Sequence, residues 1–154
     1  MSKDPFSHLT EEEFNQLEDA LALITILIGS ADGEIDDKEI TSAVKLTHIR
    51  KYFDKKELHD FYEKASEIIE DRIKELLDEL PGDNRRRIDE VTRRLKDINP
   101  ILHKLDVATA TSIYKSLKSF AKHIAASSGG FLGAFSISRE EEELIDLPML
   151  DAWP

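Results

Sequence analysis

The sequence predicts a single all-α domain, a compact bundle of about six to seven helices with a pseudo-twofold repeat. Apolar residues recur every three or four positions along most of the 154 residues. Several of these segments open with Ser, Thr or Asp followed three residues later by Glu, the pattern of a capping box. No alternating strand pattern appears. We expect the domain to span residues 10–146, between an N-terminal tail of residues 1–9 and a C-terminal tail of residues 147–154.

The first two helices follow from capping boxes. Thr10 and Glu13 open a helix whose residues 20–29 are apolar on nearly all sides, so we expect it at the centre of the bundle. Asp36 and Glu39 open the second helix, which we expect to end at about residue 48.

The remaining helices follow from caps and breakers. A box at residues 54–57 opens a long third helix, whose apolar side includes Ile68 and which ends before residues 81–82, Pro-Gly. Asp83 or Asn84 caps the fourth helix, and Asn99 caps a short helix after a break. The last two helices are expected over residues 106–126 and 138–146.

An acidic corner separates the first two helices. It reads like the second half of an EF-hand loop, but the first ligand position would fall on Ile28, which cannot bind a hard cation. We favour the interpretation that Asp36 and Glu39 cap the second helix. The alternative is a weak oxygen-only site for Mg²⁺ or Ca²⁺. The acidic residues of this corner are Asp32, Glu34, Asp36, Asp37 and Glu39.

A related corner returns near the other end of the chain. Ser127 and Gly130 align with Ser30 and Gly33, and Ser138-x-x-Glu141 repeats the spacing of Asp36-x-x-Glu39. This duplicated order of apolar helix, small residues and helix start resembles the TerB-like family of bacterial tellurite-resistance domains, over roughly residues 20–46 and 117–146. The resemblance implies a TerB-like helical bundle, a tellurite- or stress-associated role, and a weak divalent-cation site. The ligands that it implies are Asp32, Asp36, Glu39 and Glu141.

Composition excludes several classes of function. The chain has no cysteine, so it forms no disulfide or thiolate zinc site, which fits a reducing cytoplasm. A net charge of −11 argues against a nucleic-acid partner. The longest apolar run, residues 20–29, is shorter than the roughly 20 residues that cross a bilayer, and the N-terminus has no apolar signal run. We expect a cytoplasmic protein with no membrane span.

No catalytic motif stands out. The five histidines are scattered, and the glycine-rich segment 127–136 has no Walker sequence. We therefore expect no enzyme and no catalytic residue, with a carboxylate- and cation-dependent hydrolase as the alternative. The arginines of residues 85–96 are interleaved with Asp89 and Glu90, and we expect ion pairs or a solvated face there. The alternatives are a phosphate-binding patch, or docking against the acidic N-terminal residues 11–19 of this chain or of another copy.

Two segments suggest a protein partner. Phe131, Leu132 and Phe135 lie in the glycine-rich segment and either cover the core or dock on a partner. Trp153 in the C-terminal tail either docks on the domain or belongs to a linear motif. The favoured function is a non-enzymatic scaffold or stress-associated module. The alternative is a pure protein-interaction module that acts through this loop and tail, and the oligomeric state stays open.

Overall fold

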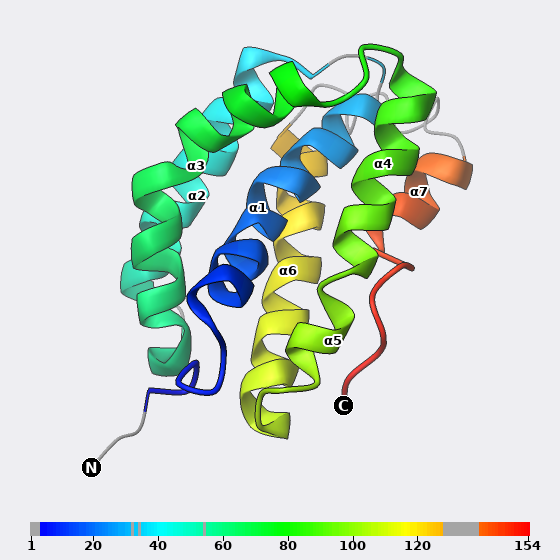
Figure 1. The fold of residues 1–154 in the computed structure, drawn as a ribbon. Coiled ribbons are helices and arrows are strands. Elements are labelled where there is room, and N and C mark those ends of the chain that lie inside the picture. Colours follow the sequence, from blue (N-terminus) through cyan, green and yellow to red (C-terminus); the bar gives the residue numbers. More distant parts are fainter. Residues whose placement is uncertain (1–3, 32, 34, 54, 128–138) are drawn as a thin grey trace.

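The computed structural model describes residues 4–31, 33, 35–53, 55–127 and 139–154, and every element in them is helical. The all-α prediction is therefore confirmed. The bundle of Figure 1 consists of α1 (Glu11–Ala31), α2 (Asp37–Phe53), a 3-10 helix η1 (Lys56–Leu58), α3 (His59–Glu79), α4 (Asn84–Lys96), α5 (Asn99–Leu102), α6 (Val107–Ser127) and α7 (Arg139–Ile145).

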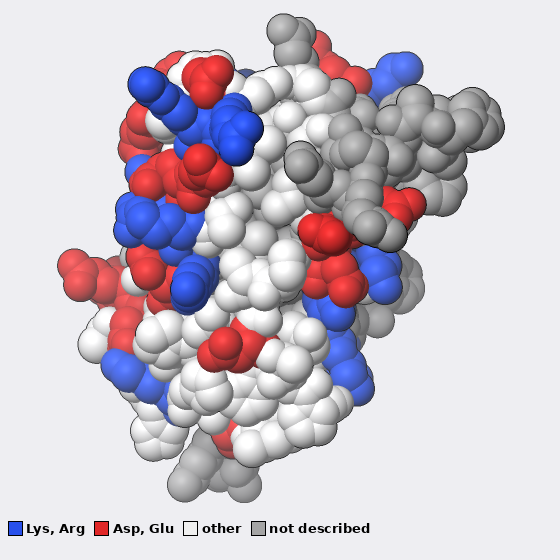
Figure 2. Space-filling model, turned by 90° about the vertical axis from the view of Figure 1, so that its right-hand side faces the viewer, with Lys and Arg blue, Asp and Glu red and all other residues white. Residues whose placement is uncertain are grey.

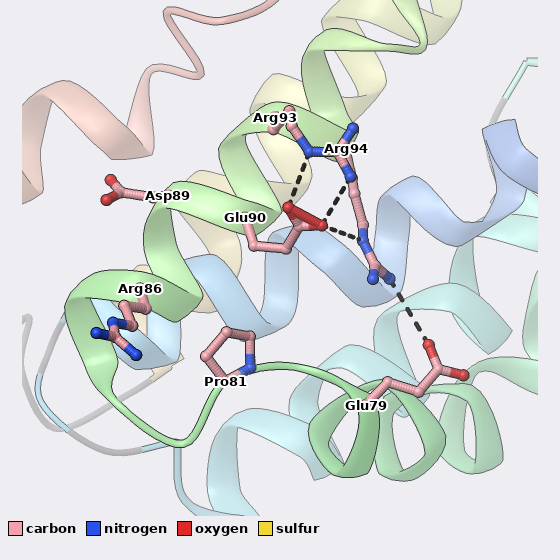
Figure 3. A pocket seen from close by; sticks show the side chains of 7 residues that line it. All are labelled: Glu79, Pro81, Arg86, Asp89, Glu90, Arg93 and Arg94. Carbon is pink, nitrogen blue, oxygen red and sulfur yellow. Dashed lines mark hydrogen bonds and ion pairs between the residues drawn. The ribbon is translucent and has the colours of Figure 1, made fainter.

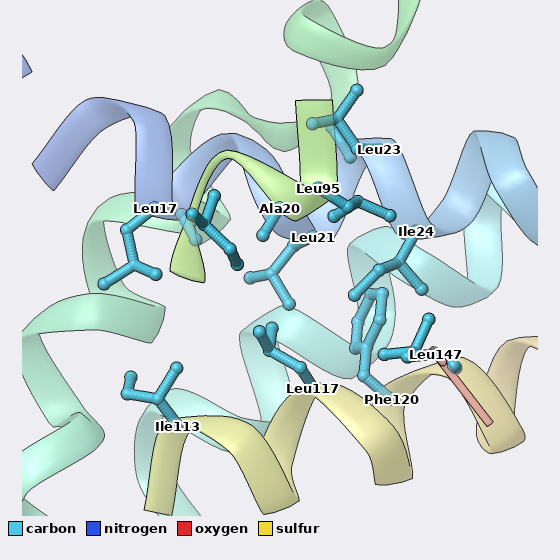
Figure 4. Close-up of a cluster of buried hydrophobic side chains, with 14 of the residues drawn as sticks. Leu17, Ala20, Leu21, Leu23, Ile24, Leu95, Ile113, Leu117, Phe120 and Leu147 are labelled. Atoms are coloured by element: carbon cyan, nitrogen blue, oxygen red, sulfur yellow. The ribbon is translucent and has the colours of Figure 1, made fainter. Parts of the chain in front are cut away.

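Helix α1 is the central element, as its apolar run predicts. It packs against α2, α3, α4, α6 and α7, and its residues from Ala20 to Ser30 are all buried. Leu21 and Ile24 face Leu117 and Phe120 of α6 in Figure 4. These four side chains are fully buried, and each such burial contributes roughly 1.5–3 kcal/mol to stability. One hydrophobic core thus surrounds α1.

Predicted caps lie at the starts of α1 and α4. The Thr10 amide donates to Glu13 Oε1 at 2.9 Å, and the Glu13 amide donates to Thr10 Oγ1 at 3.1 Å. Asp83 caps α4, because its Oδ2 accepts a hydrogen bond from the Arg86 amide at 3.1 Å. Both caps bind amide groups that have no partner within the helix.

Three predictions about helices are wrong in detail. Helix α2 continues to Phe53, beyond the expected end at residue 48. Helix α3 begins at His59, after η1, so it starts later than the box at residues 54–57 suggests; Asp54 itself lies outside the described residues. Ile68 is exposed, although it was expected on the apolar side of α3.

Asn99 also departs from its predicted role. It is the first residue of α5 and makes no capping hydrogen bond. Its Nδ2 instead donates to the Met149 carbonyl at 2.9 Å, and its Oδ1 accepts from the Asp151 amide at 2.9 Å. A buried amide thus holds the C-terminal segment against α5.

The two terminal segments contribute to the same core. Phe6 is buried and lies edge-on to Phe14, with ring centroids 5.1 Å apart. Leu147 and Leu150 are buried in the cluster that surrounds α1. No helix within the described residues is long and apolar enough to span a bilayer.

Candidate functional site

The acidic corner between α1 and α2 is built around a reciprocal cap. The Asp36 amide donates to Glu39 Oε1 at 3.0 Å, and the Glu39 amide donates to Asp36 Oδ1 at 2.9 Å. Asp36 is exposed and Glu39 is fully buried. The capping interpretation of these two carboxylates is confirmed, and it commits one oxygen of each to the start of α2.

Close packing fixes the shape of this corner. A Cβ on Gly29 would lie 2.7 Å from Ile35 Cβ, so only glycine lets the two segments approach this far. Gly33 has a φ of +114°, a backbone conformation that other residues rarely adopt. The Asn84 side chain donates to the Gly33 carbonyl and thereby ties the corner to the start of α4. The described part of the corner is a structural joint.

The structure describes the side chains of two of the four predicted metal ligands, Asp36 and Glu39, and their reciprocal cap brings them together. Asp32 and the side chain of Glu141 lie outside the described residues. In the described part of the chain, no group of three or more histidine, aspartate or glutamate side chains could hold a metal ion. The cation site at Asp32, Asp36, Glu39 and Glu141 stays a prediction.

Of the predicted partner-binding residues, the structure describes only Trp153. Phe131, Leu132 and Phe135 lie outside the described residues. Trp153 is half-buried and packs against the core, with its ring 4.8 Å from that of His103. His103 also contacts Asp151, at 3.2 Å between Nε2 and Oδ2. The Trp153 segment is docked on its own domain, and a partner-binding role for it stays a prediction.

The arginines of α4 form ion pairs, as expected from the interleaved charges. Arg93 binds both oxygens of Glu90, through Nε at 2.8 Å and Nη2 at 2.7 Å. Arg94 Nε donates to the same carboxylate at 3.0 Å and Arg94 Nη1 lies 3.7 Å from Glu79 (Figure 3). Hydrogen bonds from Arg93 and Arg94 hold the pKa of Glu90 well below its usual value. Arg93 and Arg94 thus pair with Glu90 and Glu79, and these ion pairs neutralise much of the charge that lines this hollow.

Charge is mixed on one side of the molecule and segregated on another. Figure 2 shows the side of α4, α5 and α7, where basic and acidic side chains lie interleaved around a broad uncharged area. Helices α2 and α6 pack on each other and lie behind α3 and α1 in Figure 1. Their charge is of one sign over most of their length. Residues 40–53 and 107–127 hold none of the chain's 32 acidic residues. They carry Lys45, Arg50, Lys51, Lys115, Lys118 and Lys122.

Three of these cations gather around Ser119 of α6. Lys115 and Lys122 stand four residues before and three residues after Ser119, so all three exposed side chains share one face of the helix. Arg50 of α2 reaches the same point, because its Nη2 donates to Ser119 Oγ at 2.8 Å. We call Arg50, Lys115, Ser119 and Lys122 the basic cluster. Its three cations make no ion pair with any residue that the structure describes.

Arg50 is held in place by neutral groups. Its Nη1 donates to Tyr62 Oη at 3.0 Å and to the Ser116 carbonyl at 2.8 Å. Its guanidinium carbon lies 5.7 Å from the ring centroids of both Tyr62 and Phe120. Tyr62 and Phe120 are fully buried, whereas Ser119 is exposed. Rigid contacts on the inner side thus fix a positive charge at the surface.

The outward side of α2 adds exposed apolar groups. Tyr52 is 70% exposed, the most accessible large hydrophobic side chain of the described residues, and Ile49 is 52% exposed. Lys51 Nζ lies 5.1 Å from the centroid of the Tyr52 ring. Tyrosine and arginine are enriched in protein interfaces, and this surface presents Tyr52 close to Arg50 in the sequence.

Sequence reasoning missed this surface. The signal was present, since two helical segments without any acid are unusual in a chain with 34% charged residues. The sequence does not show that the two segments are neighbours, because only the packing of α2 on α6 brings them together.

Comparison of the chain with protein-family models, with curated proteins and with solved structures gave no match in any of the three. The resemblance to the TerB-like family therefore stays a prediction.

Proposed function

We propose that this protein is a non-catalytic interaction module that binds an acidic segment of a partner protein on the surface of α2 and α6. The observation that carries the proposal is the basic cluster. It presents three cations without an ion pair among the described residues, in a chain whose net charge is −11. Complementary charge selects partners and speeds their encounter.

The overall charge supports a protein partner over a nucleic acid. A phosphate backbone carries about one charge per 1.7 Å of duplex, so it would be repelled by the rest of this acidic molecule. A short acidic peptide extends over a much smaller area. Ile49 and Tyr52 add apolar contact area that an acidic peptide with a few apolar residues would cover. The scaffold or stress-associated role expected from the sequence is compatible with such a module.

The test is a binding measurement with a defined probe. A fluorescein-labelled peptide of glutamates with interspersed leucines is titrated with the protein, and its fluorescence anisotropy is followed. A second peptide carries glutamine in place of every glutamate. We expect the glutamate peptide to bind more tightly, and its affinity to fall as salt is added, because salt screens exposed charges.

Matched charge reversals locate the binding surface. Lys115→Glu with Lys122→Glu should weaken binding by about tenfold or more, because like charges then face each other. Lys74→Glu with Lys96→Glu changes the net charge equally on exposed positions of α3 and α4 and should have little effect. Equal binding of the two peptides, or equal loss in the two double variants, would refute the proposal.

A further inference from the structure

Arg50 has one edge occupied and one edge open. A guanidinium has five N–H donors. The two hydrogens of Nη1 are shared among Tyr62 Oη, the Ser116 carbonyl and Ser116 Oγ, at 2.8–3.0 Å. Nη2 has one acceptor, Ser119 Oγ, and Nε has no hydrogen-bond partner in the described part of the chain. Among the described residues, Nε–H and the second hydrogen of Nη2 therefore have no acceptor.

Two other arginines of this molecule show what that edge binds. Arg72 uses Nε and Nη2 to hold both oxygens of Asp19, at 2.8 and 2.9 Å. Arg93 uses the same two nitrogens to hold both oxygens of Glu90 (Figure 3). This two-point geometry matches the spacing of carboxylate oxygens and is among the stronger charged contacts in proteins. Arg50 has the same pair of nitrogens, and no carboxylate of the described residues binds them.

We infer that the Nε–Nη2 edge of Arg50 is a carboxylate-binding site, which takes a glutamate or aspartate side chain of the partner. This inference rests on the proposed function and names its anchor. Lys115 and Lys122 flank the same point on α6 and would bind neighbouring carboxylates of the same segment. The contacts of Nη1 with Tyr62 and Ser116 hold the guanidinium in one orientation, so little side-chain entropy is lost on binding.

The charge of the molecule favours a carboxylate over a phosphate at this edge. A phosphate monoester carries close to two negative charges at neutral pH, and a carboxylate carries one. With a net charge of −11, the protein repels the dianion more strongly. Inorganic phosphate is therefore the competing probe in the experiment that follows.

The first test uses the unmodified protein and a small carboxylate. The Nε–H signal of Arg50 is assigned in a proton–nitrogen NMR spectrum and followed while sodium acetate, and separately sodium phosphate, is added at constant ionic strength. We expect acetate to shift this signal in a saturable way. The Nε–H signal of Arg72, whose edge is filled by Asp19, should stay in place. An Arg50 signal that ignores acetate, or that responds more strongly to phosphate, would overturn the assignment.

The second test uses the glutamate peptide and variants that keep the charge. Arg50→Lys retains a cation but removes the two-point edge, and should weaken peptide binding roughly ten- to hundredfold. Arg85→Lys, the same change at an exposed position of α4, is the matched control and should bind like the wild type. Melting curves confirm that both variants are folded at the temperature of measurement.

The outcomes separate this inference from the proposed function. The reversals at Lys115 and Lys122 could abolish binding while a folded Arg50→Lys binds like the wild type. That result would support the proposed binding surface and refute the carboxylate site at Arg50. If the glutamate peptide does not bind the wild type, the proposed function falls, and the acetate titration still decides whether Arg50 binds a carboxylate.

Discussion

At the scale of single residues, Glu18 of α1 is a buried carboxyl group. It is only 4% exposed, and its Oε2 has no hydrogen-bond partner in the described part of the chain. Burial raises the pKa of Glu18 to about 8, an effect that Lys64 opposes and that Asp19 and Glu67 reinforce. The carboxyl group is therefore mostly protonated at neutral pH in the folded protein. Unfolding would expose it to water, where its pKa is near 4.5.

This difference predicts how stability depends on pH. Between about pH 4.5 and 8, the folded protein binds more protons at Glu18 than the unfolded chain does, so the free energy of unfolding should fall as pH rises. Glu18→Gln removes this titration and should flatten the decline, which is measured by urea unfolding across that range. Glu70→Gln, at an exposed position of α3, is the control. Wild-type and Glu18→Gln curves that run parallel would show that Glu18 ionises normally.

At the scale of helices, local signals were predictable and long-range anchors were not. The caps at Thr10, Asp36 and Asp83 involve partners three residues away, which the sequence displays directly. Asn99 was misread because its partners lie 50 and 52 residues further along the chain. The end of α2 was misplaced for a similar reason, since Arg50 beyond the expected end is held by Ser116 of α6. Helix ends that depend on tertiary contacts have no local signature.

The Asn99 clamp gives a prediction at this scale. Asn99→Ala removes one donor and one acceptor of a buried amide and should lower the free energy of unfolding by about 1–3 kcal/mol. The released segment should also expose Trp153, the chain's only tryptophan, to quenching by acrylamide. The control is Asn15→Ala, at an exposed position of α1. Unchanged quenching together with unchanged stability would show that Asn99 does not hold the segment.

At the scale of the whole molecule, the distribution of charge matters more than its sum. The net charge of −11 argues against a nucleic-acid partner, but it does not reveal that residues 40–53 and 107–127 contain no acidic residue. Each segment is visible in the sequence, but their contact is not, because Arg50 and Ser116 are 66 residues apart. The fold joins the two segments into one surface and fixes an open arginine edge between them. The fold class could therefore be predicted from periodicity, whereas the candidate site required the packing of α2 on α6.

The central claim is that this surface of α2 and α6 binds an acidic partner. The most direct test maps the glutamate peptide onto the protein through the shifts of backbone amide signals in proton–nitrogen NMR spectra during a titration. We predict that the largest shifts fall on residues 45–52 of α2 and residues 115–123 of α6, and that the glutamine peptide produces none of them. Shifts centred instead on residues 128–138, on the Trp153 segment or on α4 would contradict the claim.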